Sequence, residues 1–164
     1  MKKSFYLICM IAAAVFTGCA ALPDIAPGRD LIRENKAECV LMKNGVVIYQ
    51  VRGRGISPLL EIYDLHKDLM ADAAVVDKVV GKAAAMIAIC GKAKHVHGEL
   101  MCEDAVKILK KHHITSSYTL LVPQILNRKQ DGLCPMEMTV QKMDDPAQGV
   151  SALRLKVKEL QQKK

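Results

Sequence analysis

The chain has 164 residues, a net charge of +7 and six cysteines. It has no Trp, two Phe and four Tyr, so few aromatic side chains could stack on bases, and we expect no nucleic acid among its partners. No two cysteines stand in a Cys-x-x-Cys pattern, which argues against a zinc knuckle and a thioredoxin-like motif.

Residues 1–18 have the pattern of a signal peptide. A basic start, Met1–Lys3, precedes an apolar stretch from Phe5 to Phe16 that is too short to span a bilayer. The following Thr17-Gly18-Cys19-Ala20 resembles the lipobox of bacterial lipoproteins, in which Cys19 would carry a diacylglycerol. This resemblance implies an exported, membrane-anchored lipoprotein. The alternative is a secreted or periplasmic protein, cut after Ala20 or Ala21.

The first half of the mature chain is predicted to contain one helix and one hairpin. Residues 19–29 include two prolines and a glycine and are predicted to form a tether. A short helix is expected from Asp30 to Lys36. Two apolar runs, Cys39–Met42 and Val46–Tyr49, flank Asn44-Gly45, whose residues tolerate positive φ; this pattern predicts a β-hairpin.

A basic glycine loop, Arg52–Gly55, leads to two predicted helices. Ser57-Pro58 is expected to open a helix that runs to about Met70. The next helix is predicted from Asp77 to about Cys90, because apolar residues recur there at three- and four-residue steps. Lys78 and Lys82 would then share one face near its start, where free N–H groups and two cations favour an anion. The alternative is that both lysines reach into solvent.

The second half alternates strands and helices. The predicted elements are a strand from His95 to Met101, a helix from Glu103 to about Lys111, a strand from Thr115 to Val122, a polar loop from Asn127 to Gly132, a helix from Cys134 or Pro135 to Met143, and an amphipathic helix from Asp145-Pro146 into the tail. Strand–helix–strand order argues for right-handed crossovers in one sheet, which the hairpin makes mixed. His95, His97 and Glu99 point the same way along their strand. We expect them to form one face of a strand near the surface rather than a metal site.

Three separated motifs carry a family resemblance. They are Arg52–Ile56 with Pro58–Leu60, Asp77–Ala85, and Asp131–Glu137. In this order and spacing they closely resemble domain-of-unknown-function family 1893, over residues 30–143. That family resembles a divergent branch of the cytidine-deaminase-like fold, which implies a three-layer α/β/α domain with a mixed, about five-stranded sheet. Residues 144–164 would follow as a basic C-terminal helix.

The resemblance also permits a test for zinc. In active zinc deaminases one helix begins His-Ala-Glu or Cys-Ala-Glu and another begins Pro-Cys-x-x-Cys. By element order these correspond to the helix that carries Gly81-Lys82-Ala83, predicted to start at Asp77, and to the helix that starts near Met101-Cys102-Glu103. The first start offers no ligand and the second offers one cysteine, whereas catalytic zinc needs three protein ligands. We therefore predict no metal, no cofactor and no zinc-dependent deamination.

The pocket where these two helix starts converge is the predicted binding site, because helix N-termini are rich in free N–H groups. The expected ligand is a small anionic, nucleotide-like molecule. Gly81 would let it approach the backbone, and an arginine could form two hydrogen bonds to a carboxylate or phosphate. The candidate ligand-binding residues are Arg52, Arg54, Asp77, Lys78, Gly81 and Lys82.

Two other functions remain open. One is an enzyme that depends on Lys82 or on a cysteine: Cys102 and Cys134 can both lie at helix starts, where a thiolate is favoured, and Glu137 could move protons. Inert cysteines are the competing interpretation. The other is a non-catalytic lipoprotein that binds a partner through its C-terminal helix; a homo-oligomer is also possible.

Overall fold

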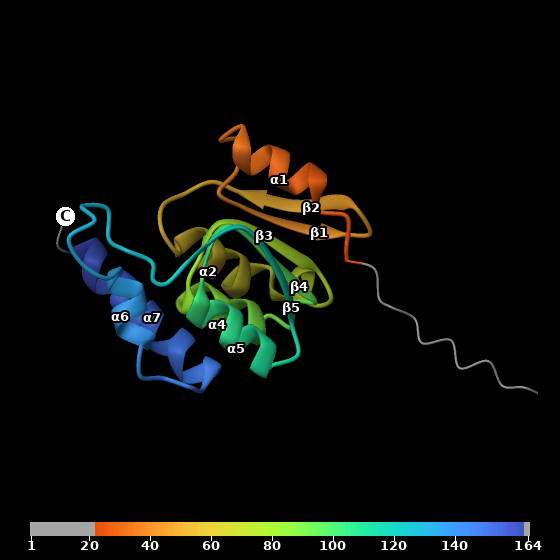
Figure 1. Cartoon of the computed structure of the whole chain (residues 1–164). Coiled ribbons are helices and arrows are strands. Elements are labelled where there is room, and N and C mark those ends of the chain that lie inside the picture. Colours follow the sequence, from red (N-terminus) through yellow and green to blue (C-terminus); the bar gives the residue numbers. More distant parts are fainter. Residues whose placement is uncertain (1–21, 163–164) are drawn as a thin grey trace, which may run out of the picture.

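The computed structural model describes residues 22–162, so the predicted signal peptide and Cys19 lie outside the described residues. The elements are α1 (Ala26–Arg33), β1 (Cys39–Lys43), β2 (Val46–Val51), α2 (Ser57–Leu65), α3 (Lys67–Met70), β3 (Ala74–Val80), α4 (Lys82–Cys90), β4 (His95–Cys102), α5 (Glu103–Lys111), β5 (Thr115–Val122), α6 (Pro135–Val140) and α7 (Pro146–Gln162). The strands form one sheet in the order β2-β1-β3-β4-β5. Helix α1 covers one face, and α2, α4 and α5 lie on the other (Figure 1). The predicted α/β fold with a mixed, five-stranded sheet is confirmed.

The predicted hairpin is confirmed and forms one edge of the sheet. Strands β1 and β2 are antiparallel, and the turn between them places Asn44 at φ 50° and Gly45 at φ 77°. Positive φ at both central residues matches the twist of a two-residue hairpin. Strand β1 also pairs antiparallel with β3, whereas β3, β4 and β5 are parallel to one another.

The predicted helix start at Asp77 is wrong. Residues Ala74–Val80 form β3, the central strand, and α4 begins only at Lys82. Val75 and Val76 are buried in separate hydrophobic clusters, one on each face of the sheet. An apolar run that is buried on both faces is typical of a central strand with parallel neighbours. Valine is β-branched and favours the strand conformation. Lys78 therefore lies on a strand and Lys82 on the next helix, and they do not share a helix face.

Several other boundaries differ from the expected ones. Helix α1 begins at Ala26, within the predicted tether, because Pro27 suits the first turn of a helix. The helix expected from Ser57 to Met70 is interrupted at His66, which separates α2 from α3. Helix α6 ends at Val140. The strands β4 and β5 and the helix α5 lie where they were predicted, within one residue.

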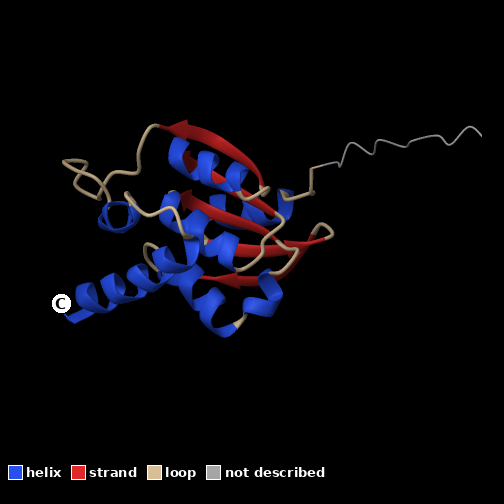
Figure 2. Ribbon diagram, turned by 90° about the horizontal axis from the view of Figure 1, so that it is seen from below, coloured by secondary structure: helices blue, strands red, loops and turns tan. Residues whose placement is uncertain are grey.

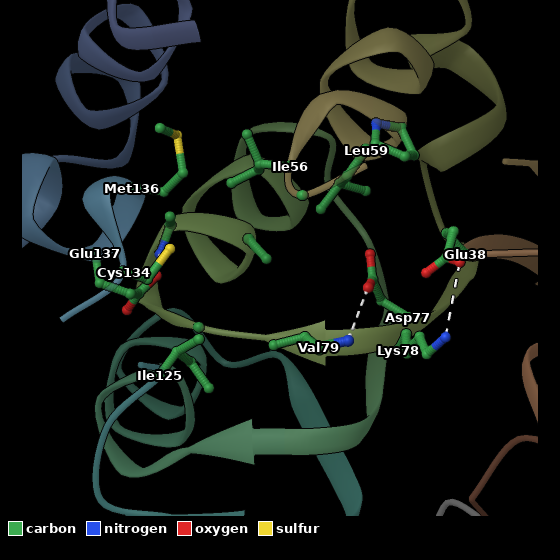
Figure 3. A pocket seen from close by; sticks show the side chains of 15 residues that line it. Glu38, Ile56, Leu59, Asp77, Lys78, Val79, Ile125, Cys134, Met136 and Glu137 are labelled. Atoms are coloured by element: carbon green, nitrogen blue, oxygen red, sulfur yellow. Dashed lines mark hydrogen bonds and ion pairs between the residues drawn. The ribbon is translucent and has the colours of Figure 1, made fainter. Parts of the chain in front are cut away.

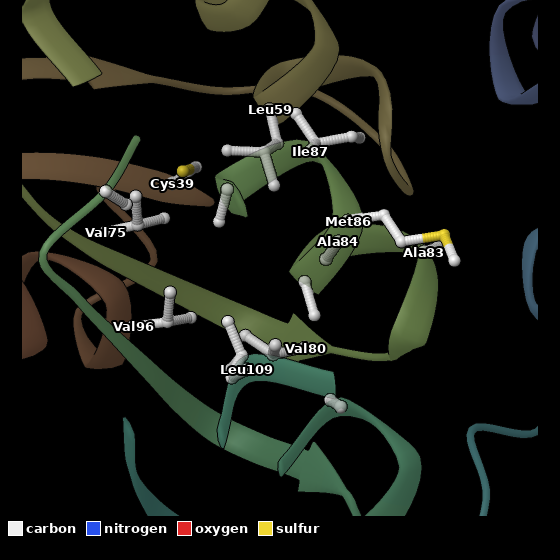
Figure 4. Packing of buried hydrophobic residues seen from close by; sticks show 14 of the residues in the cluster. Cys39, Leu59, Val75, Val80, Ala83, Ala84, Met86, Ile87, Val96 and Leu109 are labelled. Carbon is white, nitrogen blue, oxygen red and sulfur yellow. The ribbon is translucent and has the colours of Figure 1, made fainter. Parts of the chain in front are cut away.

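Helix α4 forms the centre of the larger core. Its residues 83–88 are all buried (Figure 4). Helix α7 packs against α4 and contributes Val150 and Leu153 to the same cluster, so it belongs to the core of the domain. Figure 2 shows this C-terminal helix extending past the strands. Among residues 22–162, no helix is both long and apolar enough to cross a membrane.

The histidines of β4 are not near the surface as expected. His95 and His97 are 1% and 2% exposed, and burial lowers the pKa of both imidazoles, that of His95 to about 4. The side chain of Ser117 lies between them, 2.9 Å from His95 Nε2 and 2.8 Å from His97 Nδ1. Strand β5 therefore satisfies these two ring nitrogens by hydrogen bonding, and this pairing makes their burial possible.

Glu99 continues this polar face and ties α1 to the sheet. Its carboxylate accepts hydrogen bonds from Arg29 Nε at 3.0 Å, from Thr119 Oγ1 at 2.7 Å and from Arg33 Nε at 3.4 Å. Partial burial favours the neutral acid, but the hydrogen bonds and the two arginine charges outweigh it and lower the pKa of Glu99 to about 2. The predicted trio of His95, His97 and Glu99 is thus part of a hydrogen-bonded network between β4, β5 and α1.

Candidate functional site

A cavity of about 140 Å³ lies between the start of α2, strand β3, the start of α4 and the segment before α6 (Figure 3). Its apolar wall includes Ile56, Leu59, Val79, Ile125 and Met136, and its ionisable residues are Glu38, Asp77, Lys78, Cys134 and Glu137. A larger hollow of about 280 Å³ lies near the hairpin turn and contains none of the predicted ligand-binding residues. The smaller cavity is therefore the candidate site.

Asp77 is the central polar group of this cavity. It is partly buried in β3, and its Oδ1 accepts the N–H of Val79 at 3.0 Å. Burial raises the pKa of this carboxyl to about 7, although hydrogen bonds from the Val79 N–H and the Cys39 thiol act in the opposite direction. Near neutral pH Asp77 therefore exists in both protonation states and can either accept or donate a hydrogen bond.

The N-terminus of α4 is occupied by the chain itself. Glu137 Oε2 accepts the N–H of Lys82 at 2.8 Å, and Oε1 accepts the N–H of Ala83 at 3.0 Å. Gly81 makes this approach possible, since a Cβ atom there would overlap the carboxylate. Burial raises the pKa of Glu137, and the two N–H groups oppose that rise. The helix start that was expected to attract an external anion thus holds an internal one.

The basic candidates divide into two groups. Lys78 Nζ bonds Asn35 Oδ1 at 3.0 Å and lies 3.7 Å from a carboxylate oxygen of Glu38, at the rim of the cavity. Arg52 Nη2 also donates to Asn35, to its backbone oxygen at 3.1 Å. Lys82 instead donates to the backbone oxygen of Gln141 at 3.0 Å. Asp77, Lys78 and Gly81 thus line the cavity, and Arg52 lies near Lys78 because both bond Asn35. Exposed Arg54 lies on the adjacent loop, and Lys82 points to Gln141.

The catalytic candidates meet at a second, smaller cavity. Lys82, Cys102 and Glu137 line a space of about 30 Å³, whereas Cys134 lines the larger cavity. The N–H groups of Ala105 and Lys82 both reach the Cys102 thiol, so the starts of α5 and α4 converge there as expected. Burial nevertheless raises the pKa of Cys102, and the charge of Glu137 adds to the rise. The thiol is therefore held in its protonated form, opposite to the activation that a nucleophile needs.

Donor groups for a metal are sparse at these helix starts. Helix α4 begins with Lys82 and Ala83, and α5 follows a single cysteine, Cys102. Within residues 22–162, no group of three or more His, Cys, Asp or Glu side chains could hold a metal ion. The four cysteines of this region are all free.

Sequence reasoning missed two features of the site. Asn35 and Glu38 precede β1, far from the expected helix, and only the fold brings them to Lys78. Glu137 was considered for proton transfer, but its contact with α4 spans 54 and 55 residues of sequence. The motif Asp131–Glu137 was a signal that this segment matters, without indicating its partner.

Two comparisons identify relatives of this fold. Residues 29–157 match the family described as Domain of unknown function (DUF1893). The chain belongs to this family. A crystal structure of a DUF1893 family protein from Thermotoga maritima, at 2.70 Å resolution, is similar to it with a TM-score of 0.72. The two sequences are 24% identical, and the match covers 81% of this chain and 89% of that one. No curated protein matches the chain significantly.

The matched region of this DUF1893 chain includes all three motifs, so Arg52, Asp77 and Glu137 all lie inside it. At this level of identity the Thermotoga maritima structure supports the fold alone.

Proposed function

We propose that this DUF1893 domain binds a small nucleotide-like molecule, with one ring inside the cavity and an anionic group at its rim. The observation that carries the proposal is Asp77, a partly buried carboxyl with a pKa of about 7 among apolar walls. A ligand pocket typically combines an apolar lining with a few placed polar groups, one of which has a perturbed pKa. Asp77 can bond the N–H edge of a heteroaromatic ring.

The size of the cavity limits what can enter it. Pockets for drug-sized ligands measure roughly 300–1,000 Å³, so a cavity of about 140 Å³ accommodates a single ring rather than a whole nucleotide. The remainder of the ligand would extend toward Gly55 and Lys78, two lining residues that also reach the protein surface. The three motifs resemble family 1893, and the resemblance of that family to the cytidine-deaminase-like fold supports the same class of ligand.

The charges around the cavity support an anionic group that lies outside it. Glu38, Asp77 and Glu137 line the cavity against one cation, Lys78, and the N–H groups at the start of α4 are already bonded to Glu137. A phosphate inside would therefore meet carboxylates without enough donors. At the rim it would meet Lys78, with Arg52 and Arg54 on the adjacent loop, and arginine and lysine are the usual phosphate partners.

Isothermal titration calorimetry tests this proposal with defined probes: the four ribonucleosides and their 5′-monophosphates. We expect at least one nucleoside to bind the purified chain, and its monophosphate to bind more tightly. Asp77→Asn should weaken both ligands, whereas Lys78→Ala should weaken only the monophosphate. Lys158→Ala, which removes an exposed lysine on α7, is the matched control and should change neither affinity.

Two results would contradict the proposal. One is the absence of binding by all eight probes at millimolar concentration. The other is a loss of affinity in Lys82→Ala with no loss in Lys78→Ala, because Lys82 Nζ points to Gln141 and that result would move the ligand to the start of α4.

We also propose that the domain is carried at a bacterial membrane by a diacylglycerol on Cys19. The basic start, the short apolar stretch and Thr17-Gly18-Cys19 support this. Mass spectrometry of the mature N-terminus should find a lipidated cysteine, and Cys19→Ser should release the protein from the membrane fraction. A mature N-terminus at residue 21 or 22 without lipid would instead indicate the secreted or periplasmic alternative.

A further inference from the structure

The strand β5 forms an edge of the sheet without the usual protection. Within the described residues it pairs with β4 on one side and has no strand on the other. Its eight residues, Thr-Ser-Ser-Tyr-Thr-Leu-Leu-Val, contain no charge and no proline. Natural edge strands normally carry lysine, proline or a bulge, because unpaired backbone groups otherwise attract another strand. Strand β5 therefore has the features of a strand that is paired in the working protein.

The exposed side chains distinguish β5 from the opposite edge. Tyr118, Leu120 and Leu121 are 45%, 56% and 38% exposed. On β2, the other edge strand, Val46 beside the hairpin turn is 62% exposed. The other large apolar residues of β2 are half-buried. Apolar side chains on both faces of one unpaired strand mark an interaction surface.

The sequence of β5 is complementary to itself. If two copies pair antiparallel with Thr119 at the two-fold axis, Tyr118 of each strand lies opposite Leu120 of the other. An aromatic residue opposite an aliphatic one is a favourable cross-strand pair. The same axis then generates two such pairs, as the isologous interface of a symmetric dimer requires.

Helix α5 adds charge complementarity to the same edge. It lies beside β5, as Figure 1 shows, and connects it to β4. Its first residues, Glu103 and Asp104, are exposed and acidic, and its last ones, Lys110 and Lys111, are exposed and basic. A two-fold axis perpendicular to the sheet places two α5 helices antiparallel on the same face. The acidic start of each helix then lies beside the basic end of the other.

We propose that β5 and α5 form the interface of a homodimer, in which two β5 strands join antiparallel into one continuous ten-stranded sheet. The occupant of the edge is a second copy of this chain, because the strand is complementary to itself and the charges of α5 are matched by their own rotated copy. An unrelated partner would have to supply both features separately.

Analytical ultracentrifugation of the purified chain tests the proposal, with an edge variant and a control on the opposite edge. The wild-type chain should sediment at twice the mass of its protomer at micromolar concentration. Leu120→Lys places a charge on the exposed edge and should raise the dimer dissociation constant by about tenfold or more. Val46→Lys introduces the same charge at an exposed position of β2 and should leave it unchanged. Circular dichroism confirms that both variants remain folded.

High salt should weaken the wild-type dimer as well, because the pairs between α5 helices are exposed. A wild-type chain that stays monomeric up to near-millimolar concentration would overturn the proposal. So would a dimer that Val46→Lys dissociates while Leu120→Lys does not, since the interface would then lie at the β2 edge.

Discussion

The carboxylate of Glu137 lies against Gly81, so closely that position 81 has no room for a Cβ atom. From this position the carboxylate accepts the N–H groups of Lys82 and Ala83. The first N–H groups of a helix have no partner within that helix. Glu137 supplies the partner from α6, and thereby links α6 to the buried helix α4.

Gly81→Ala should lower the free energy of unfolding by about 2–3 kcal/mol. The added methyl group would displace the carboxylate and leave the N–H groups at the start of α4 without their partner. Urea denaturation measures the change. In a Glu137→Ala background the same substitution should cost less than about 1 kcal/mol, because the two residues in contact are coupled.

Gly132→Ala is the matched control for this experiment. A Cβ atom at position 132 would meet only Asn127 Nδ2, at 3.4 Å, which is an ordinary contact. Its effect should stay within about 0.5 kcal/mol. Equal losses in Gly81→Ala and Gly132→Ala would show that the contact with Glu137 is not the cause.

The elements with one clear signal could be predicted from the sequence. The Asn44-Gly45 turn and the strand–helix–strand order of β4, α5 and β5 were predicted correctly. The error at β3 has a physical cause. The spacing of its valines, Val75, Val76, Val79 and Val80, fits a helical period and is also compatible with a buried strand. A short apolar run does not distinguish the two. Gly81 marked the boundary, but it lay inside the predicted helix.

Some of the candidate residues do lie together in the fold, but the contacts around them could not be predicted from the sequence. Asp77, Lys78 and Gly81 line one cavity, whereas Arg52 is outside its lining and bonds the backbone oxygen of Asn35. Sequence could not show that Glu137 occupies the start of α4, because that contact depends on how α6 packs. Nor could it show that Lys82 points to Gln141. Both contacts are tertiary and have no local pattern.

The stability of the protein should depend on pH through Asp77. Its pKa is about 7 in the folded chain and 3.8 without the fold, so the folded state holds a proton that the unfolded state releases. This contribution is fully present below pH 3.8 and is lost as the pH rises through about 7. The contribution of Asp77 to the free energy of unfolding should therefore fall over this range, whereas His95 and His97, whose pKa values are lowered, contribute a change of opposite sign. Glu137, whose pKa is also raised by burial, adds a change of the same sign as that of Asp77.

Asp77→Asn removes the titrating group while keeping an oxygen that can accept the N–H of Val79. The variant should lose most of this pH dependence, so that its stability relative to the wild type is greater at pH 8 than at pH 4. Urea denaturation at several pH values measures both curves. Parallel curves would mean that Asp77 is not the group responsible.

Glu99→Gln should destabilise the chain by about 1–3 kcal/mol at neutral pH, because it weakens charge-assisted hydrogen bonds between the sheet and α1. The pKa of Glu99 is lowered to about 2 from 4.5. Its contribution is therefore present above pH 4.5 and lost as the pH falls through about 2. Thermal denaturation should show the wild type and the variant converging in acid.

Glu34→Gln is the control for this prediction. Glu34 lies next to α1 and forms an exposed ion pair with Lys36 at 2.6 Å. Exposed pairs contribute little, so the change should stay below about 0.5 kcal/mol. If Glu34→Gln costs as much as Glu99→Gln, the loss reflects net charge and not the contacts of Glu99.

Alkylation of the native protein separates a structural Cys102 from a catalytic one. Cys39 and Cys102 are buried, and burial raises the pKa of both thiols. Iodoacetamide at neutral pH should modify half-buried Cys134 at least about tenfold faster than Cys102, since the thiolate is the reactive species. Peptide mapping by mass spectrometry assigns each site. Fast modification of Cys102 in the folded chain would contradict its protonated state and favour the enzyme hypothesis, with Lys82 and Glu137 beside the thiol.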